Sequence, residues 1–182
     1  MSSVYASIVE EAGNPLVIDS SKHPQYFAAM RPIVEPRLLH LVRDPRGVAY
    51  SWTVAKRDPD RAAGAMEVRR PEVIAAEWML INASAARVIS GASYGKRMRL
   101  EDVVDKGIEE VADSLSLNSA QPAQRGFLHT VAGNPLRHDG HLGELRQDER
   151  WRDSMSQSLR TRVSVLTFPL LRTMGYRGSR SE

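Results

Sequence analysis

The segment RLLHLVRDPRGVAYSW, residues 37–52, decides the fold that the sequence predicts. Its first half, residues 37–44, is an almost continuous apolar run, which is typical of a parallel strand covered on both faces. Asp44 and Pro45 then mark a helix start, because Asp is a good N-cap and Pro at the first helical position loses no hydrogen bond. We expect this helix to run to about Arg57.

Strand and helix patterns alternate on both sides of this segment. The short apolar run LVID at 16–19 predicts a further strand, and so does the stretch 96–103. Apolar residues at helical spacing predict helices over 3–12, 25–31, 71–90, 104–115 and from Trp151 to a stop at Gly175, with a kink at Pro169. This order indicates an α/β domain with a parallel sheet flanked by helices, whose ligands bind beyond the carboxyl ends of the strands.

The composition indicates one ordinary globular domain over residues 1–182. Lys and Arg number 25 against 22 Asp and Glu, and the signs are mixed along the chain, unlike the clustered basic blocks of nucleic-acid-binding proteins. No run approaches the roughly 20 apolar residues of a membrane span, and no Cys is present for disulfides or thiolate metal sites. We expect a cytoplasmic protein with no membrane span and no nucleic-acid partner.

Arg43 and Ser51 are the first candidate site residues. Arg43 leaves the carboxyl end of the predicted strand, where the N-terminus of the following helix also favours an anion. Ser51 lies two turns into that helix and could donate its hydroxyl to a phosphate that Arg43 holds. The spacing alone favours a structural interpretation, in which Arg43 pairs with a carboxylate and Ser51 is a small packing residue. Glu101 and Asp102, near the end of another predicted strand, are interpreted as residues that fix the strand end and cap the next helix.

The stretch RDPRGVAYS (43–51) resembles the 3′-phosphate-binding motif of the sulfotransferases that use 3′-phosphoadenosine 5′-phosphosulfate (PAPS). Four further segments agree with this resemblance, which is to bacterial and carbohydrate-type members: VIDSSKHP (17–24), RLEDVV (99–104), the stretch 129–151 that ends in Asp-x-x-Trp, and LLRTMGY (170–176). The resemblance implies a P-loop-kinase-like parallel sheet flanked by helices. It also implies PAPS as co-substrate and no metal.

The resemblance implies roles for individual residues as well. Arg43 and Ser51 would hold the 3′-phosphate, joined by Arg137 from a C-terminal loop. Lys22 would be the cation beside the bridging oxygen, because Lys is a compact point charge, and His23 is the candidate general base. Other members use a carboxylate as the base. The acceptor would be a hydroxyl or amine of a small molecule or carbohydrate, in a pocket shaped by variable loops.

One part of the family pattern is missing from these 182 residues, namely the strand and Gly-rich loop of the type G-x-P-R-S-G-T that wraps the 5′-phosphosulfate. We therefore expect an N-terminally truncated sulfotransferase domain, in which the sheet lacks its first strand and an unpaired edge with an apolar groove lies beside residues 38–43. The alternative is an inactive or truncated remnant that binds at most the 3′-phosphoadenosine end of the nucleotide. A P-loop kinase is disfavoured because the sequence contains no G-x-x-x-x-G-K-[ST].

Overall fold

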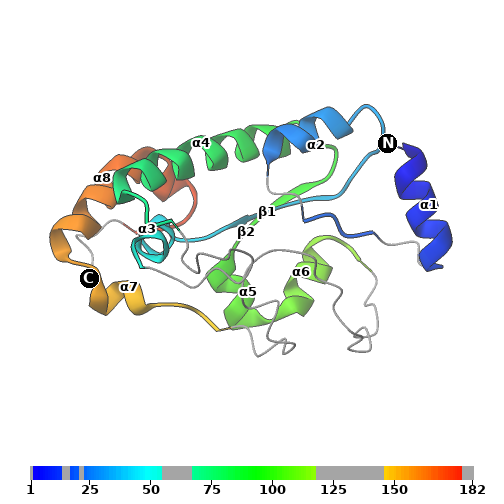
Figure 1. Ribbon diagram of the computed structural model, residues 1–182. Helices are drawn as coiled ribbons and strands as arrows, with labels where there is room; N and C mark the ends of the chain where they lie inside the picture. Colours follow the sequence, from blue (N-terminus) through cyan, green and yellow to red (C-terminus); the bar gives the residue numbers. More distant parts are fainter. Residues whose placement is uncertain (1, 14–16, 21–22, 55–66, 118–145, 178–182) are drawn as a thin grey trace.

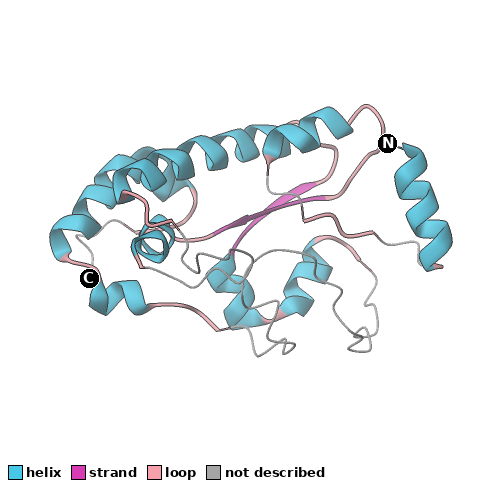
Figure 2. Ribbon diagram, in the orientation of Figure 1, coloured by secondary structure: helices cyan, strands magenta, loops and turns pink. Residues whose placement is uncertain are grey.

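The computed structural model describes residues 2–13, 17–20, 23–54, 67–117 and 146–177. Figure 1 and Figure 2 show a layer of long helices over a short sheet, with smaller helices on the other side of the sheet. The strands are β1 (Leu38–Val42) and β2 (Gly95–Arg99). The helices of the described residues are α1 (Ser2–Ala12), α2 (Pro24–Met30), α3 (Pro45–Thr53), α4 (Pro71–Ser90), α5 (Leu100–Lys106), α6 (Ile108–Ser114), α7 (Arg150–Ser154) and α8 (Gln157–Thr173).

The sheet is parallel, as predicted. Leu38 lies opposite Gly95 and Val42 opposite Arg99, and the connection between the two strands contains α3 and α4. The described part of the chain is thus a mixed α/β fold with a two-stranded parallel sheet flanked by helices. The strand–helix junction expected within residues 37–52 is confirmed as β1 followed by α3.

The prediction of a strand at 16–19 is wrong for residues 17–19, which the structure describes. Residues 17–20 have no regular secondary structure and join no sheet. Ile18 is 81% exposed, so this short apolar run does not bury its side chains as a strand of the core would. Within the described residues β1 consequently has a strand neighbour on one side only, and its Leu41 is 46% exposed.

Some predicted elements are shorter than expected because the backbone changes direction inside them. The strand predicted over 96–103 stops at Arg99, and the next residues begin α5 with two carboxylates in its first turn, where they favour a helix N-terminus. The helix predicted over 104–115 is divided at Gly107, whose φ of 93° is in the region that favours glycine. The last helix is divided into α7 and α8 at Met155, which is extended.

Other helix predictions agree with the structure. The first helix ends before Gly13 and the last before Gly175, both of which have positive φ, and the helix over 71–90 is present as predicted. α3 ends at Thr53, four residues earlier than predicted, because Val54 is extended. α8 continues through Pro169 to its last residue.

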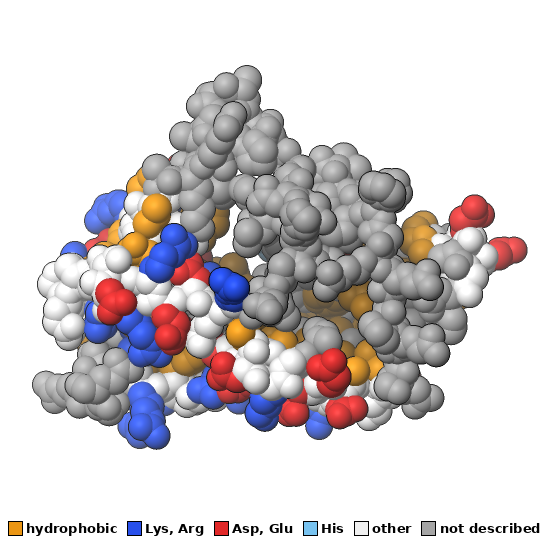
Figure 3. Space-filling view, turned by 90° about the horizontal axis from the view of Figure 1, so that it is seen from below, with side chains coloured by type: hydrophobic (Ala, Val, Ile, Leu, Met, Phe, Trp, Pro, Cys, Tyr) orange, Lys and Arg blue, Asp and Glu red, His pale blue; other side chains and the backbone are white. Residues whose placement is uncertain are grey.

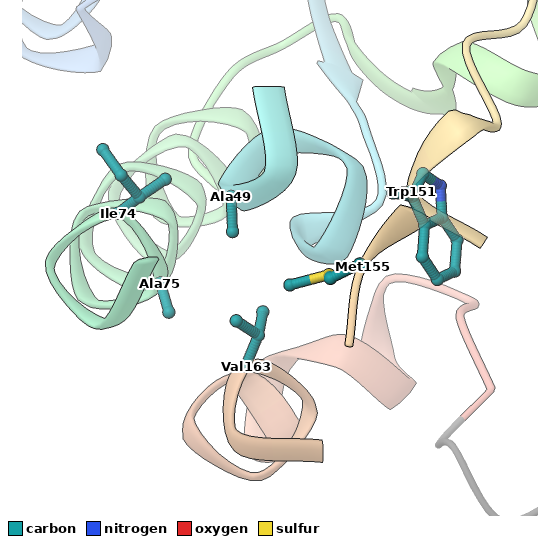
Figure 4. Packing of buried hydrophobic residues seen from close by; sticks show 6 residues of the cluster. All are labelled: Ala49, Ile74, Ala75, Trp151, Met155 and Val163. Atoms are coloured by element: carbon teal, nitrogen blue, oxygen red, sulfur yellow. The ribbon is translucent and has the colours of Figure 1, made fainter. Parts of the chain in front are cut away.

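Two apolar clusters pack the helices together, and the second of them includes the last residue of β1. The first lies between α3, α4, α7 and α8 (Figure 4), and its buried members are Ala49, Ile74, Ala75, Trp151, Met155 and Val163. The second contains Val42, Trp78, Leu171, Met174 and Tyr176. Burying a large apolar side chain stabilises a fold by about 1.5–3 kcal/mol. The second cluster therefore anchors the strand end from which Arg43 leaves.

α4 is, among the described residues, the helix that is long and apolar enough to cross a membrane, with 20 residues and a mean hydropathy of 1.3. One of its faces is used for packing inside this domain, since Ile74, Trp78 and Asn82 are buried and α4 contacts α8, α3 and β1. The opposite face is open, with Leu80 68% exposed. The expected lack of a membrane span stays a prediction.

His40 and Asn82 form a buried polar pair between β1 and α4. Nε2 of His40 lies 2.8 Å from Oδ1 of Asn82, whose Nδ2 donates to the Trp78 carbonyl at 2.7 Å. Because Oδ1 accepts, Nε2 carries the ring proton, and Nδ1 has no hydrogen-bond partner in the described part of the chain. Burial lowers the pKa of His40 below its ordinary 6.5, although the hydrogen bond to Asn82 opposes this effect.

The free energy of unfolding should therefore fall as the solution becomes acidic. Below pH 6.5, His40 of the unfolded chain binds a proton that the buried side chain of the folded protein excludes. The free energy of unfolding therefore has its full value above this pH, and part of it is lost as the pH drops through the lowered pKa of the folded state. Urea unfolding between about pH 7.5 and about pH 5 would measure the slope. His40→Gln, which can still donate to Asn82, should show a shallower slope, and equal slopes for the two proteins would contradict the prediction.

Candidate anion-binding pocket

A pocket of about 910 Å³ opens at the carboxyl end of β1. Its walls come from four segments: the β1–α3 junction, the β2–α5 junction, residues 146–152 and residues 175–177. Figure 1 shows these segments converging, with α3, α5 and α7 around the end of the sheet. This is the edge of a parallel sheet at which ligands are expected.

Arg43 lines this pocket from the first residue after β1. Its Nη2 lies 3.6 Å from Oδ2 of Asp148, and each of the two side chains is 30% exposed. The Arg43 carbonyl accepts a hydrogen bond from Nε1 of Trp78 at 3.0 Å. Arg43 therefore pairs with a carboxylate, as the structural interpretation of the motif expects. Its guanidinium nevertheless lies at the wall of a pocket.

Ser51 lines the same pocket from the second turn of α3 and is half-buried. The structure therefore brings together the two residues that the sequence motif singled out. Gly47 lies between them on α3, and a Cβ there would lie 3.1 Å from Cδ1 of Trp151 and 3.5 Å from Nε of Arg43. A glycine at this position lets the Trp151 ring and the Arg43 side chain approach the helix closely.

A buried ion pair shapes the start of α3. Asp44 is the N-cap and accepts from the backbone N–H of Arg46 at 2.8 Å, which confirms its predicted capping role. The same carboxylate accepts from Nε and Nη2 of Arg46 at 3.0 and 2.7 Å. The guanidinium of Arg46 lies 4.6 Å from the centre of the Trp151 ring. Asp44 and Arg46 are thereby held side by side in the pocket wall.

Glu101 connects three segments at the same end of the sheet. Its Oε1 accepts the backbone N–H of Asp44 at 3.0 Å, and its Oε2 accepts the hydroxyl of Tyr176 at 2.7 Å. Burial raises the pKa of Tyr176, and the hydrogen bond to Glu101 adds to the increase. The expectation that Glu101 fixes the end of its own strand and caps the next helix is wrong, because Glu101 instead holds the residue that follows the end of β1 and forms no side-chain cap at α5. Asp102 instead pairs with Arg99.

Asp148 is held between two arginines. Arg150 donates to it from Nε and Nη2, both at 2.8 Å, and Arg43 lies beyond. These hydrogen bonds from Arg150 are the main cause that lowers the pKa of Asp148 to about 2, and the charge of Arg43 adds to them. Asp148 therefore stays ionised and occupies the position beside Arg43 that a phosphate oxygen could take.

The pocket lining carries charges of both signs. Its seven arginines are Arg43, Arg46, Arg99, Arg146, Arg150, Arg152 and Arg177. Its six carboxylates are Asp44, Glu101, Asp102, Asp105, Asp148 and Glu149. The face shown in Figure 3 has the same character, since Lys and Arg side chains alternate there with Asp and Glu. An anionic ligand would therefore have to replace a carboxylate at one of these arginines, because the lining is not an open cationic patch.

The remaining candidate residues do not join this group. Lys22 and Arg137 lie outside the described residues. His23 is exposed just before α2 and is not among the residues that line the pocket. Nearby, Asp19 accepts the hydroxyl of Tyr5 at 2.6 Å, and this hydrogen bond is the main cause that raises the pKa of Tyr5.

Sequence reasoning missed three residues that the structure places in the pocket wall in contact with other segments. The sequence motif RDPR contains Arg46 but assigns it no role. Trp151 enters only as the start of the last predicted helix and the end of the Asp-x-x-Trp pattern, and Tyr176 only as part of a C-terminal ending. The contacts of Trp151 and Tyr176 span more than 70 residues of sequence, so no local signal could have found them.

Within the described residues, no group of three or more His, Cys, Asp or Glu side chains could hold a metal ion. Comparisons with protein-family models, with curated proteins and with solved structures find no match for this chain. What the pocket does is therefore argued from its own residues and geometry.

Proposed function

We propose that this chain is a PAPS-dependent sulfotransferase-type protein with a P-loop-kinase-like sheet, and that the pocket at the end of β1 binds the 3′-phosphate of the nucleotide. One observation carries the proposal. Arg43 and Ser51, eight positions apart in a strand–turn–helix segment, line one pocket beyond the carboxyl end of a parallel strand. That is the arrangement that the resemblance to the family implies for these two residues.

The chemistry of the two side chains suits a phosphate. The planar guanidinium of Arg43 can form two parallel hydrogen bonds to phosphate oxygens, and the Ser51 hydroxyl can add another. On this proposal the phosphate displaces the carboxylate of Asp148 from Arg43, and Asp148 keeps its two hydrogen bonds from Arg150. The ionised Asp148 then remains paired after the exchange.

In sulfuryl transfer, a hydroxyl or amine of the small-molecule or carbohydrate acceptor attacks the sulfur of PAPS. A bond from the acceptor to sulfur forms, the bond from sulfur to the bridging oxygen breaks, and a base takes the acceptor proton. On the family resemblance, Lys22 would stabilise the leaving phosphate, His23 would be the base and Arg137 would join the 3′-phosphate site. These three roles belong to the proposal, and so does the cytoplasmic location.

A remnant that binds only the 3′-phosphoadenosine end is the second candidate. It is favoured by one observation, namely that His23 does not line the pocket that contains Arg43 and Ser51. The two candidates differ in transfer of sulfate from PAPS, which only the enzyme performs. Both require the same preference for a nucleotide with a 3′-phosphate.

Binding of adenosine 3′,5′-bisphosphate and of AMP, measured by calorimetry, tests the shared requirement. The wild-type chain should bind the bisphosphate more tightly, because only this nucleotide carries a 3′-phosphate. Arg43→Ala should weaken its binding by about 1.5–3 kcal/mol, the range for hydrogen bonds to charged groups, and should leave AMP binding unchanged. Arg162→Ala, which removes an exposed arginine outside the pocket, is the matched control.

In the same binding experiment, Asp148→Asn should have the opposite effect to Arg43→Ala. It removes the carboxylate beside Arg43, so bisphosphate binding should become tighter. Equal affinity for the two nucleotides in the wild-type chain would refute the 3′-phosphate site. Release of labelled sulfate from PAPS to an acceptor then separates the enzyme from the remnant.

A further inference from the structure

The backbone on both sides of Arg43 is held by side chains from distant parts of the chain. The peptide group after Arg43 donates its N–H, that of Asp44, to Oε1 of Glu101 at 3.0 Å. The peptide group before Arg43 has its carbonyl, that of Val42, 3.1 Å from the hydroxyl of Tyr176. The same hydroxyl lies 2.7 Å from Oε2 of Glu101 and shares its single proton between this carboxylate and the Val42 carbonyl, so one carboxylate and one phenol together hold both peptides.

The two groups are themselves firmly placed. Tyr176 is 7% exposed and belongs to the buried cluster with Val42, Trp78, Leu171 and Met174. It reaches this position because the chain turns at Gly175, whose φ is 86°. Glu101 lies in the first turn of α5, directly after β2. A third hydrogen bond, from Nε1 of Trp78 to the Arg43 carbonyl, holds the same backbone from α4.

We propose that Glu101 and Tyr176 are positioning residues, which fix the backbone at Arg43 and so direct its guanidinium to the 3′-phosphate. This inference rests on the proposed function. Neither residue needs to touch the ligand. Fixing both flanking peptides sets the direction of the Cα–Cβ bond of Arg43, and placement of a binding group matters because small displacements are costly.

Electrostatics alone predicts the opposite effect, which makes the inference testable. Glu101 is an acidic residue of the pocket lining, so removing its charge should by itself strengthen the binding of an anion. If Glu101 acts by positioning, Glu101→Ala should instead weaken the binding of adenosine 3′,5′-bisphosphate. Asp105→Ala is the matched control, because Asp105 is an exposed carboxylate of the same helix and the same pocket.

The experiment is a calorimetric binding series on the whole chain with adenosine 3′,5′-bisphosphate and AMP. Glu101→Ala should weaken bisphosphate binding by about tenfold or more, the size of a lost charged hydrogen bond, and leave AMP unchanged. Arg43→Ala/Glu101→Ala should bind no more weakly than Arg43→Ala, because Glu101 acts through Arg43. Glu101→Gln, whose amide oxygen can still accept from Asp44, should recover part of the loss. Asp105→Ala should bind as tightly as the wild-type chain or more tightly.

Tyr176→Phe keeps the buried ring and removes only the hydroxyl, so it provides a variant that folds if Glu101→Ala does not. It should weaken bisphosphate binding in the same direction. If the wild-type chain shows no preference for the bisphosphate, both the proposed function and this inference are overturned. If the preference exists and requires Arg43, but Glu101→Ala and Tyr176→Phe bind as tightly as the wild-type chain, only the positioning role is overturned.

Discussion

Replacing Asp44 by Ala is expected to lower the free energy of unfolding by about 3–5 kcal/mol, because it leaves a buried charge without its partner. Arg46 is 4% exposed, and its Nε and Nη2 donate hydrogen bonds to the two carboxylate oxygens of Asp44. The substitution also removes the N-cap of α3, which is typically worth about 1 kcal/mol within such a total. Urea unfolding of the wild-type and variant chains measures the difference.

The double variant Asp44→Ala/Arg46→Met separates the lost pair from the lost cap. Removing both charged groups together leaves no unpaired charge, so most of the stability should return. Asp105→Ala, an exposed carboxylate of the same pocket, should change stability by less than about 0.5 kcal/mol. A loss below about 1 kcal/mol for Asp44→Ala, the value of an exposed ion pair, would contradict this account of the start of α3.

The parts of the fold that the sequence predicted correctly are those set by neighbouring residues. The junction of β1 and α3 follows from an apolar run, an N-cap at Asp44 and a proline at the first helical position, all within a few residues. The ends of α1 and α8 follow in the same way from Gly13 and Gly175. Arg43 and Ser51 were found because the strand and helix that carry them have such local signals.

Apart from the element boundaries at Arg99, Gly107 and Met155, the errors concern features that depend on distant contacts. The run LVID has the composition of a strand, but a strand requires a neighbour with which to pair, and residues 17–20 have none within the described residues. The pairing of Asp148 with Arg43 and the hydrogen bond of Tyr176 to Glu101 join residues 105 and 75 positions apart. Local sequence patterns predict that these side chains are polar, but they do not predict which residues the side chains pair with.

Trp151→Ala is expected to have an effect of similar size to that of Asp44→Ala, a loss of about 3–5 kcal/mol, as for other buried aromatic residues. The ring is 4% exposed and packs in the cluster of α3, α4 and α8 that Figure 4 shows. Trp151 also lines the pocket, and the guanidinium of Arg46 lies over its ring. The change should therefore create a cavity in the core and remove one wall of the anion site. Urea unfolding measures the loss of stability.

Two further substitutions make this prediction specific to the buried ring. Trp52→Ala removes an indole that is only partly buried against the same cluster, so its effect on stability should be smaller. Trp151→Phe keeps an aromatic ring beside Gly47, where an added Cβ would lie only 3.1 Å from Cδ1 of the indole. It should therefore fall between the wild-type chain and Trp151→Ala. If Trp151→Ala were no more destabilising than Trp52→Ala, the packing of α7 against α3 would not contribute to the core as the structure indicates, because Trp151 is the buried residue of α7.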